Sequence, residues 1–175
     1  MPVSLPERPD LSDAEVLLLR QVAGGHLNAA VSRATGIPEK SVAAAVNALM
    51  SKLGTANRHH AAALGAAWGW VRAEDVPVIN PSGQQLPKGR RKVLEALVAG
   101  DEPETAAGRL GLSENTVRVY IQDVLRALGV RSRQQAAAIA LLTGIVPPSA
   151  LGDGWPDTGL AAVHGPADRQ PAGVS

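Results

Sequence analysis

An internal duplication constrains this chain more than any other feature of its sequence. Residues 11–71 align with residues 86–146 at a constant offset of 75 positions, without a gap. Of the 61 aligned positions 14 are identical, and four of the identical pairs are glycines. Glycines that recur at a fixed offset mark matching turns and helix ends. The pattern therefore predicts two copies of one small fold.

Each copy has the sequence pattern of four short helices. In the first copy, Ser12 and Glu15 form a capping-box pattern directly before an apolar run. We expect its helices near residues 13–23, 28–34, 38–53 and 58–68. The chain contains no Phe and a single Tyr, so its cores must be built from Leu, Val, Ile and Ala. Such a core favours closely packed helices over sheets, and the predicted fold class is all-α.

The segments outside the two copies show no apolar periodicity. Residues 1–10 contain three prolines and predict a flexible arm. Residues 72–85 have the Pro, Asn, Ser and Gly content of a linker, which leaves open whether the copies pack together. Residues 147–175 begin with two prolines and are rich in Gly, Pro, Ala and Asp, which predicts a disordered tail.

Composition excludes several classes of function. Without cysteine, the chain has no disulfide framework, thiolate zinc site or thiol nucleophile. Adjacent His59 and His60 point to different sides of a helix and have no carboxylate three or four residues away, so we expect no metal site. A nucleophilic triad, a phosphate-cradling glycine loop and a paired-carboxylate site are missing, so we expect neither an enzyme nor a cofactor. No apolar run has spanning length and no signal peptide is present, which favours a cytoplasmic protein without a membrane partner.

The stretch from Leu112 to Gly129 gives the strongest indication of function. Its apolar residues recur at helical spacing, with Ser113 as N-cap, and predict one buried stripe. A short helix over 104–110 and a turn at Gly111 precede it, which is the spacing of a helix-turn-helix. The opposite face carries hydrogen-bonding, cationic and small apolar groups, namely Asn115, Thr116, Arg118, Val119 and Gln122. Such a face can read base edges in a DNA major groove.

The second copy also matches a known family pattern. The matching residues are Leu112-Ser113, Thr116-Val117, Leu128-Gly129, Ser132-Arg133, Ala136 and Ala140, with Gly144-Ile145-Val146 closing the unit. With them, residues 86–146 resemble the LuxR-type (GerE-like) helix-turn-helix domain. Tyr120 stands where that family usually has His, and Arg118 where it usually has Lys. The resemblance implies a four-helix domain that binds DNA through its third helix and commonly dimerises through its fourth.

Basic residues of the second copy favour contact with the DNA backbone. Residues 86–146 hold nine Lys or Arg against six acidic residues. We expect phosphate contacts from Lys88, Arg91, Arg126, Arg131, Ser132 and Arg133. For the cluster at 88–92, a solvated basic face is the alternative.

The first copy keeps the scaffold but departs on the corresponding face. Ala43 and Ala44 occupy the positions that align with Arg118 and Val119, and Pro38 occupies the position of the capping Ser113. We therefore expect an assembly module or a weak backbone contact rather than a base reader. The residues available for weak DNA contact are Lys40, Ser41, Asn47 and Arg58.

These patterns predict a bacterial transcriptional regulator that binds double-stranded DNA at the nucleoid, with the second copy as principal reader. The alternative is a protein-interaction module that binds RNA polymerase, a sigma factor or another regulator, and RNA polymerase is also a candidate partner of a DNA-binding regulator. For assembly we favour a homodimer through small and apolar residues of the last helix, Ala137, Ala138, Leu141 and Leu142. Pairing of the two fourth helices within one chain is the alternative.

Overall fold

The computed structural model describes residues 6–78 and 85–157, which form two similar four-helix units. The first unit contains α1 (Asp13–Ala23), α2 (Asn28–Thr35), α3 (Glu39–Leu53) and α4 (Arg58–Ala67). The second contains α5 (Lys88–Val98), α6 (Pro103–Leu110), α7 (Glu114–Leu128) and α8 (Arg133–Leu142). Short 3-10 helices, η1 (Ala73–Asp75) and η2 (Pro148–Leu151), follow the units. No strand occurs over the two described ranges, and the all-α prediction is confirmed.

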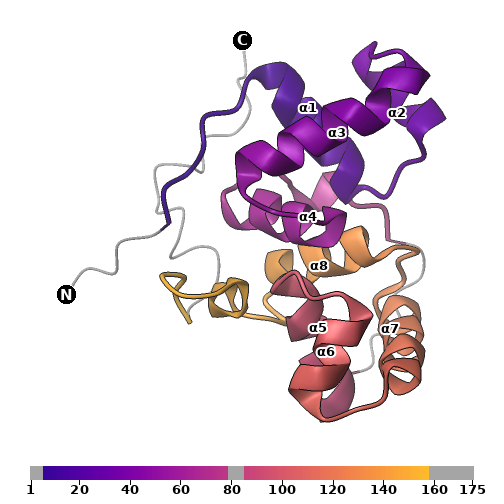
Figure 1. Cartoon of the computed structure of the whole chain (residues 1–175), viewed down its shortest axis with the longest axis vertical. Coiled ribbons are helices and arrows are strands. Elements are labelled where there is room, and N and C mark those ends of the chain that lie inside the picture. The colour runs from indigo at the N-terminus through magenta and orange to yellow at the C-terminus, as the bar shows by residue number, and fades with distance from the viewer. Residues whose placement is uncertain (1–5, 79–84, 158–175) are drawn as a thin grey trace.

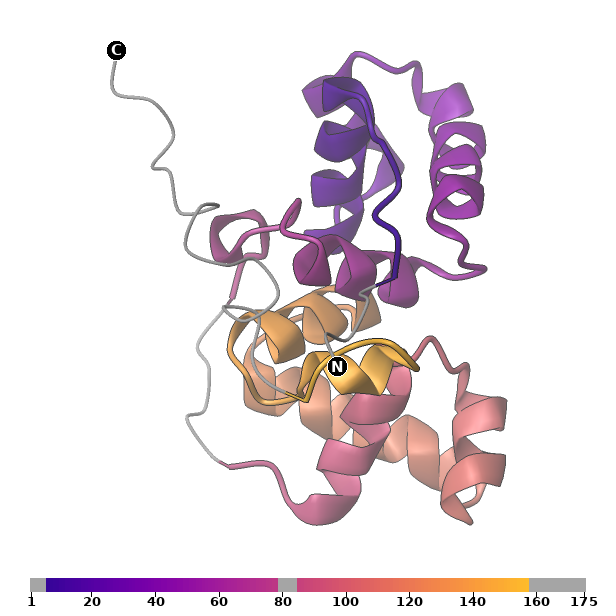
Figure 2. The ribbon, with the colours of Figure 1, turned by 90° about the vertical axis from the view of Figure 1, so that its left-hand side faces the viewer.

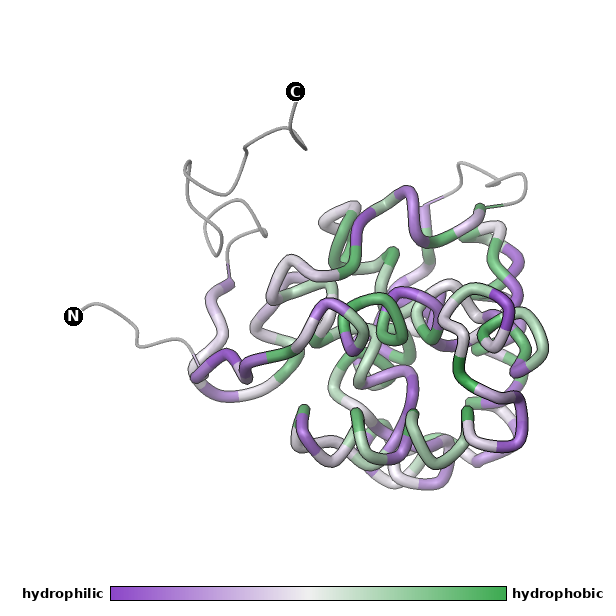
Figure 3. Tube along the Cα trace, turned by 90° about the horizontal axis from the view of Figure 1, so that it is seen from above, coloured by the Kyte–Doolittle hydropathy of each residue, from purple (hydrophilic) through white to green (hydrophobic). Residues whose placement is uncertain are grey.

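The predicted helix bounds agree with the structure to within about one residue. Ser12 and Glu15 form the capping box of α1: the Ser12 hydroxyl accepts from the Glu15 amide (3.2 Å), and the Ser12 amide donates to Glu15 Oε1 (3.0 Å). Hydrophilic and hydrophobic residues alternate along the helices in Figure 3, as expected where one face is buried. None of the described helices is both long and apolar enough to cross a membrane.

The two units pack against each other through their fourth helices. In Figures 1 and 2, α4 and α8 lie side by side across the middle of the molecule, between the rest of the first unit and the rest of the second. The alanines at 61–63 and 136–138 are at most 1% exposed. Small side chains allow two helix backbones to approach closely. The buried residues of both units consequently belong to one continuous core.

This packing corrects our expectation of a homodimer through the last helix. Ala137 and Ala138 are fully buried within the single chain, Leu141 is 2% exposed, and Leu142 is half-buried against the same core. The surface that a second chain would need is covered by α4. The duplicated chain supplies its own partner helix, and tethering gives that helix a high effective concentration. The structure therefore has the intrachain arrangement.

The contact between the units repeats itself about an approximate two-fold axis. Asn57, the N-cap of α4, donates from Nδ2 to the carbonyl of Gly100 in the turn after α5 (2.6 Å). Its counterpart Ser132, the N-cap of α8, lies against Gly25 in the turn after α1, where a Cβ would lie 2.7 Å from Ser132 Oγ. A Cβ on Gly100 would similarly lie 2.8 Å from Cγ of His60. Contacts that exchange counterparts in this way define a two-fold interface.

Gly25 and Gly100 thus do more than end helices. Both have positive φ (70° and 89°), which disfavours any residue with a side chain. Both also lie too close to the opposite unit to accept a Cβ. The identical glycine at these two positions therefore marks the interface between the units as well as the helix ends.

The segments after each unit are ordered over part of their length. In residues 72–78, Val76 is buried, and the carbonyl of Pro77 accepts from Gln135 Nε2 (3.3 Å). After α8, η2 packs on α5 and α4, and Trp155 is 8% exposed. Our prediction of a disordered tail is therefore wrong for residues 147–157. Residues 158–175 and the linker residues 79–84 lie outside the described residues.

All three tryptophans of the chain gather at one end of α4. The ring centroid of Trp68 lies 5.7 Å from that of Trp70 and 5.4 Å from that of Trp155. The guanidinium carbon of Arg8 lies 4.4 Å from the centroid of the Trp70 ring. Tilted aromatic pairs and a cation over an aromatic face both stabilise such a cluster. The cluster therefore connects the C-terminal segment, and Arg8 of the predicted arm, to the core.

Candidate nucleic-acid interface

Helix α7 has one face in the core and the other in solvent. Its buried residues are those of the predicted apolar stripe, Val117, Ile121, Val124, Leu125 and Leu128. Ser113 Oγ accepts from the amide of Thr116 (3.0 Å) and caps the helix. Gly111 makes the turn from α6 with a φ of 67°, although a Cβ there would meet nothing within 4 Å. Its conformation, rather than crowding, explains glycine at this position.

The five predicted base-reading residues all lie on the outer side of α7. Asn115, Arg118 and Gln122 are exposed, and Val119 is 51% exposed. Thr116 is half-buried, with its hydroxyl 2.8 Å from that of Ser113. The face thus combines amide, guanidinium, hydroxyl and methyl groups, the set that distinguishes base pairs in a major groove.

Arg118 is held along the outer face by a carboxylate one turn earlier. Its Nη2 and Nε donate to Glu114 Oε1 at 2.6 and 3.1 Å. Both side chains are about half exposed. An exposed pair of this kind contributes about 0–1 kcal/mol. A better acceptor can therefore displace the Glu114 carboxylate at little cost.

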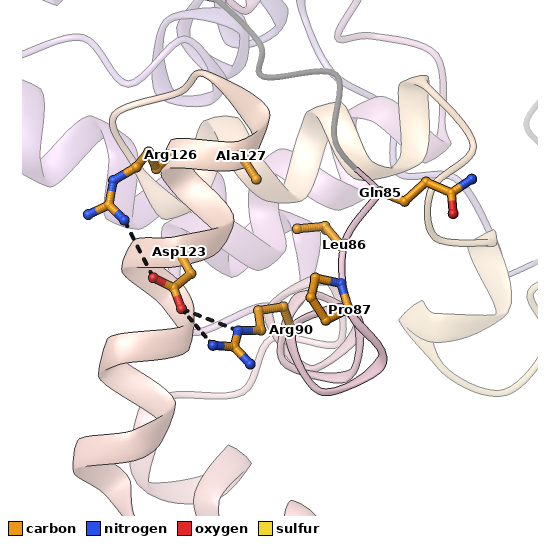
Figure 4. A pocket seen from close by; sticks show the side chains of 7 residues that line it. All are labelled: Gln85, Leu86, Pro87, Arg90, Asp123, Arg126 and Ala127. Carbon is orange, nitrogen blue, oxygen red and sulfur yellow. Dashed lines mark hydrogen bonds and ion pairs between the residues drawn. The ribbon is translucent and has the colours of Figure 1, made fainter.

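An arginine from α5 fixes the second half of α7 (Figure 4). Arg90 donates from Nε and Nη2 to Oδ2 of Asp123 (3.2 and 3.0 Å). Its guanidinium carbon also lies 4.0 Å from the Tyr120 ring centroid. Arg126 approaches the other Asp123 oxygen at 3.5 Å. Arg90, Asp123 and Arg126 line a pocket of about 350 Å³, together with Leu86 and its neighbours. Arg90 is thus a positioning residue for α7.

The sequence did not single out Arg90. It lies in the basic cluster 88–92, and position along the chain does not show which of its four cations turns toward α7. The opposite charge of Asp123 on the facing helix is the one signal that identifies it, and it requires knowing how α5 and α7 pack.

The predicted phosphate-binding residues fall into two groups. Lys88, Arg91 and Arg131 are exposed and have no acidic partner within the described part of the chain. Arg126 pairs with Asp123, and Arg133 Nη1 lies 3.3 Å from Oε2 of Glu102.

Ser132, the remaining residue of the predicted phosphate set, is already engaged within the protein. Its hydroxyl accepts from the Gln135 amide (3.2 Å) and donates to Gln135 Oε1 (3.3 Å). A phosphate would have to compete for that proton.

An open groove of about 570 Å³ runs between the two units beside α7. It is lined by the end of α3, the start of α4, the middle of α7 and the start of α8. Counterparts from the two units both line it, such as Met50 with Leu125 and Arg58 with Arg133. The groove therefore lies on the approximate two-fold axis. With Arg131 added, three arginines line it against the single acidic residue Glu102.

The corresponding face of α3 is smaller and less charged. Lys40, Ala43, Ala44 and Asn47 are exposed, and Ser41 is half-buried. The N-cap of α3 is Pro38, which makes no side-chain hydrogen bond. The first unit therefore keeps the scaffold while presenting different chemistry on its third helix.

Two histidines are enclosed where the units meet. His59 is 4% exposed, and its Nε2 donates to the carbonyl of Asp101 (2.9 Å) because a carbonyl oxygen only accepts. His60 places Nδ1 2.8 Å from Thr55 Oγ1, while its buried Nε2 has no hydrogen-bond partner among the residues that the structure describes. Burial lowers the pKa of His59 to about 4, a shift that Glu102 opposes and Arg133 reinforces. Burial also lowers the pKa of His60, so both rings are neutral at pH 7.

Comparison with known proteins places this geometry in a family. Residues 9–64 and 84–140 each match the model described as "Bacterial regulatory proteins, luxR family". The two matches together cover more than half of the chain and coincide with the two units. The chain belongs to the luxR family. Its two units are tandem LuxR-type helix-turn-helix domains, with α3 and α7 as their third helices.

Two relatives are similar to this chain over the length of about one unit. The chain is 39% identical over 62 residues to the transcriptional regulatory protein FixJ of Azorhizobium caulinodans, a stretch that covers 35% of this chain and 29% of FixJ. It is also 39% identical over 59 residues to the spore germination protein GerE of Bacillus subtilis, covering 34% of this chain and 80% of GerE. The match thus spans less than a third of FixJ and most of GerE. No solved structure matches the chain.

Proposed function

We propose that this protein is a transcriptional regulator that binds double-stranded DNA sequence-specifically, with α7 as the principal reader in the major groove. The observation that carries the proposal is the outer face of α7, which is polar, cationic and exposed on a helix anchored by five buried residues. The names of the relatives, one a transcriptional regulatory protein, support a regulatory role.

The residues on this face have complementary roles toward base pairs. The guanidinium of Arg118 matches the paired acceptors of guanine, and the amide of Gln122 or Asn115 matches adenine. Val119 can contact a thymine methyl group, and the Thr116 hydroxyl can serve either kind of edge. Since the Glu114 carboxylate is weakly held, Arg118 can exchange it for a base without a large penalty.

Phosphate contacts fix the register of α7 on the duplex. Lys88, Arg91 and Arg131 are available directly, whereas Arg126 and Arg133 exchange their carboxylates for phosphate. The weaker contacts of the first unit come from Lys40, Ser41, Asn47 and Arg58. The roles of all these residues are part of the proposal.

The test separates base reading from backbone contact. A preferred duplex is first selected from a random pool, and fluorescence anisotropy then measures its affinity beside that of a scrambled duplex. Arg118→Ala should weaken specific binding by about 1–3 kcal/mol and leave the scrambled duplex unaffected, while Arg133→Ala should weaken both. Arg72→Ala, an exposed change outside both units, is the control. Unchanged affinity for Arg118→Ala would remove α7 from the interface.

The rival function, a protein-interaction module, has less support. Interaction surfaces concentrate large apolar residues at their centre. The outer face of α7 carries one exposed large apolar residue, Val119, and the others in the described ranges, Leu17, Leu27 and Val78, lie on other segments. Contact with RNA polymerase and location at the nucleoid stay predictions.

A further inference from the structure

We infer that one chain of this protein binds one asymmetric DNA site, in which the two units contact two unlike half-sites of the same duplex. The inference rests on the proposed function and adds the form of the partner. The half-site under α7 is specified by its bases, whereas the half-site under α3 is held mainly through the backbone.

An approximate two-fold axis relates the two units. The contact of Asn57 with Gly100 and that of Ser132 with Gly25 exchange counterparts, so the axis that relates α4 to α8 also relates α3 to α7. A two-fold rotation leaves the height along its axis unchanged. Helices α3 and α7 therefore lie at the same height, and a duplex perpendicular to the axis can meet both.

The groove on that axis joins the two third helices. Gln122 of α7, a predicted base reader, lines it, and so does Met50 at the end of α3. A duplex lying on the outer face of α7 would therefore pass over the groove toward α3. On this path it meets Arg131, Arg133 and Arg58, and three cations against Glu102 suit a polyanion.

One chain supplies both units that contact the duplex. The fourth-helix surface through which a second chain would pair is covered by α4, and Ala137 and Ala138 are inaccessible. A dimer would contact DNA through two third helices, and one chain already contains two, α3 and α7. Binding should therefore follow a single-site isotherm that does not depend on prior dimerisation.

The two third helices present different side chains. The counterparts differ at every predicted reading position, and the pairs are Lys40 and Asn115, Ser41 and Thr116, Ala43 and Arg118, Ala44 and Val119, and Asn47 and Gln122. The methyl groups of exposed Ala43 and Ala44 cannot donate to a base edge. A symmetric homodimer requires an inverted repeat, whereas this pair of unlike faces requires a site with a fixed direction.

The experiment copies the α7 face onto α3 in the full-length chain. The variant carries Lys40→Asn, Ser41→Thr, Ala43→Arg, Ala44→Val and Asn47→Gln, all at exposed or half-buried positions. It should bind an inverted repeat of the selected half-site, with half-sites about 34 Å apart or a multiple of that, at least about tenfold more tightly than the wild type does. Sedimentation with a labelled duplex should show one chain per duplex for both proteins. The reciprocal double variant, Arg118→Ala with Val119→Ala, should lose selective binding.

The outcomes separate this inference from the proposed function. If the wild type selects no sequence from a random pool, the proposed function itself fails. If it selects a sequence but binds as two chains on an inverted repeat, the inference is overturned while the function stands. The same holds if the copied face leaves site preference unchanged in a variant whose circular dichroism melt matches the wild type. Should that variant fail to fold, the stoichiometry of the wild type still decides.

Discussion

Acidification from pH 7 to pH 5 should destabilise the folded chain by about 2 kcal/mol through His59. In the folded chain this ring is 4% exposed and bonded to the carbonyl of Asp101, and burial lowers its pKa from 6.5 to about 4. Between pH 6.5 and pH 4 the unfolded chain therefore binds a proton at His59, whereas the folded chain does not. Stability is complete above about pH 6.5 and falls as the pH drops toward 4.

The size of this loss follows from the two pKa values. A difference of one unit corresponds to about 1.4 kcal/mol, so the full loss at His59 is about 3 kcal/mol, of which about 2 kcal/mol is reached at pH 5. The lowered pKa of His60 acts in the same direction. Glu15 also has a lowered pKa, held down by the Ser12 amide and Lys52, but its contribution is lost below its ordinary pKa of 4.5. Comparing pH 7 with pH 5 therefore isolates the histidines.

Urea unfolding followed by tryptophan fluorescence measures the loss at both pH values. His59→Gln is the informative variant, because glutamine occupies the counterpart position 134 and its amide can still donate to the Asp101 carbonyl. It should lose about 2 kcal/mol less than the wild type on acidification. His26→Gln, which removes an exposed histidine, is the matched control. An equal loss in His59→Gln and the wild type would refute the reasoning.

Three further predictions follow from the packing between the units. Gly100→Ala should lower the free energy of urea unfolding by about 2 kcal/mol or more, because it adds a clash with His60 to backbone strain. Gly36→Ala has open space around it and should lower that free energy by about 1 kcal/mol, from strain alone. Equal losses in the two variants would show that the close contact between Gly100 and His60 does not affect stability. Trp155→Ala should lower the unfolding free energy by about 3 kcal/mol or more, whereas exposed Asp153→Ala should leave it unchanged; an unchanged melting temperature for Trp155→Ala would show that Trp155 is not part of the core. Ala137→Glu should unfold the chain or lower its stability by several kcal/mol, because it buries a charge against α4. If analytical ultracentrifugation instead shows a wild-type dimer, and this variant is a folded monomer, the prediction of a homodimer through α8 is correct.

Much of the fold follows from local rules. Capping residues such as Ser12 and Ser113, and glycines at a constant offset, determine where helices begin and end, and both signals are short-range. The outer face of α7 follows as well, because helical periodicity assigns Val117 and Ile121 inward and Arg118 outward. These inferences need no knowledge of how the helices pack.

The assembly could not be predicted, because its determinants are long-range. The alanine runs of α4 and α8 suit pairing within a chain as well as between chains, and the sequence does not show which occurs. Trp155 lies in a segment without periodicity, yet it docks because Trp68 is placed to receive it. Arg90 likewise turns toward α7 for a partner 33 residues away.

Pairing α4 with α8 inside one chain also changes what a single substitution can do. In a homodimer every change appears twice across the interface, so both ends of the paired helices stay alike. Here the residue that follows α4 is Trp68, whereas the counterpart that follows α8 is Thr143. A receptor for Trp155 can therefore exist at one end and not at the other. Because the ends of α4 and α8 differ, the segment that carries Trp155 can pack at only one of them, whereas a symmetric pair would offer it two equivalent positions.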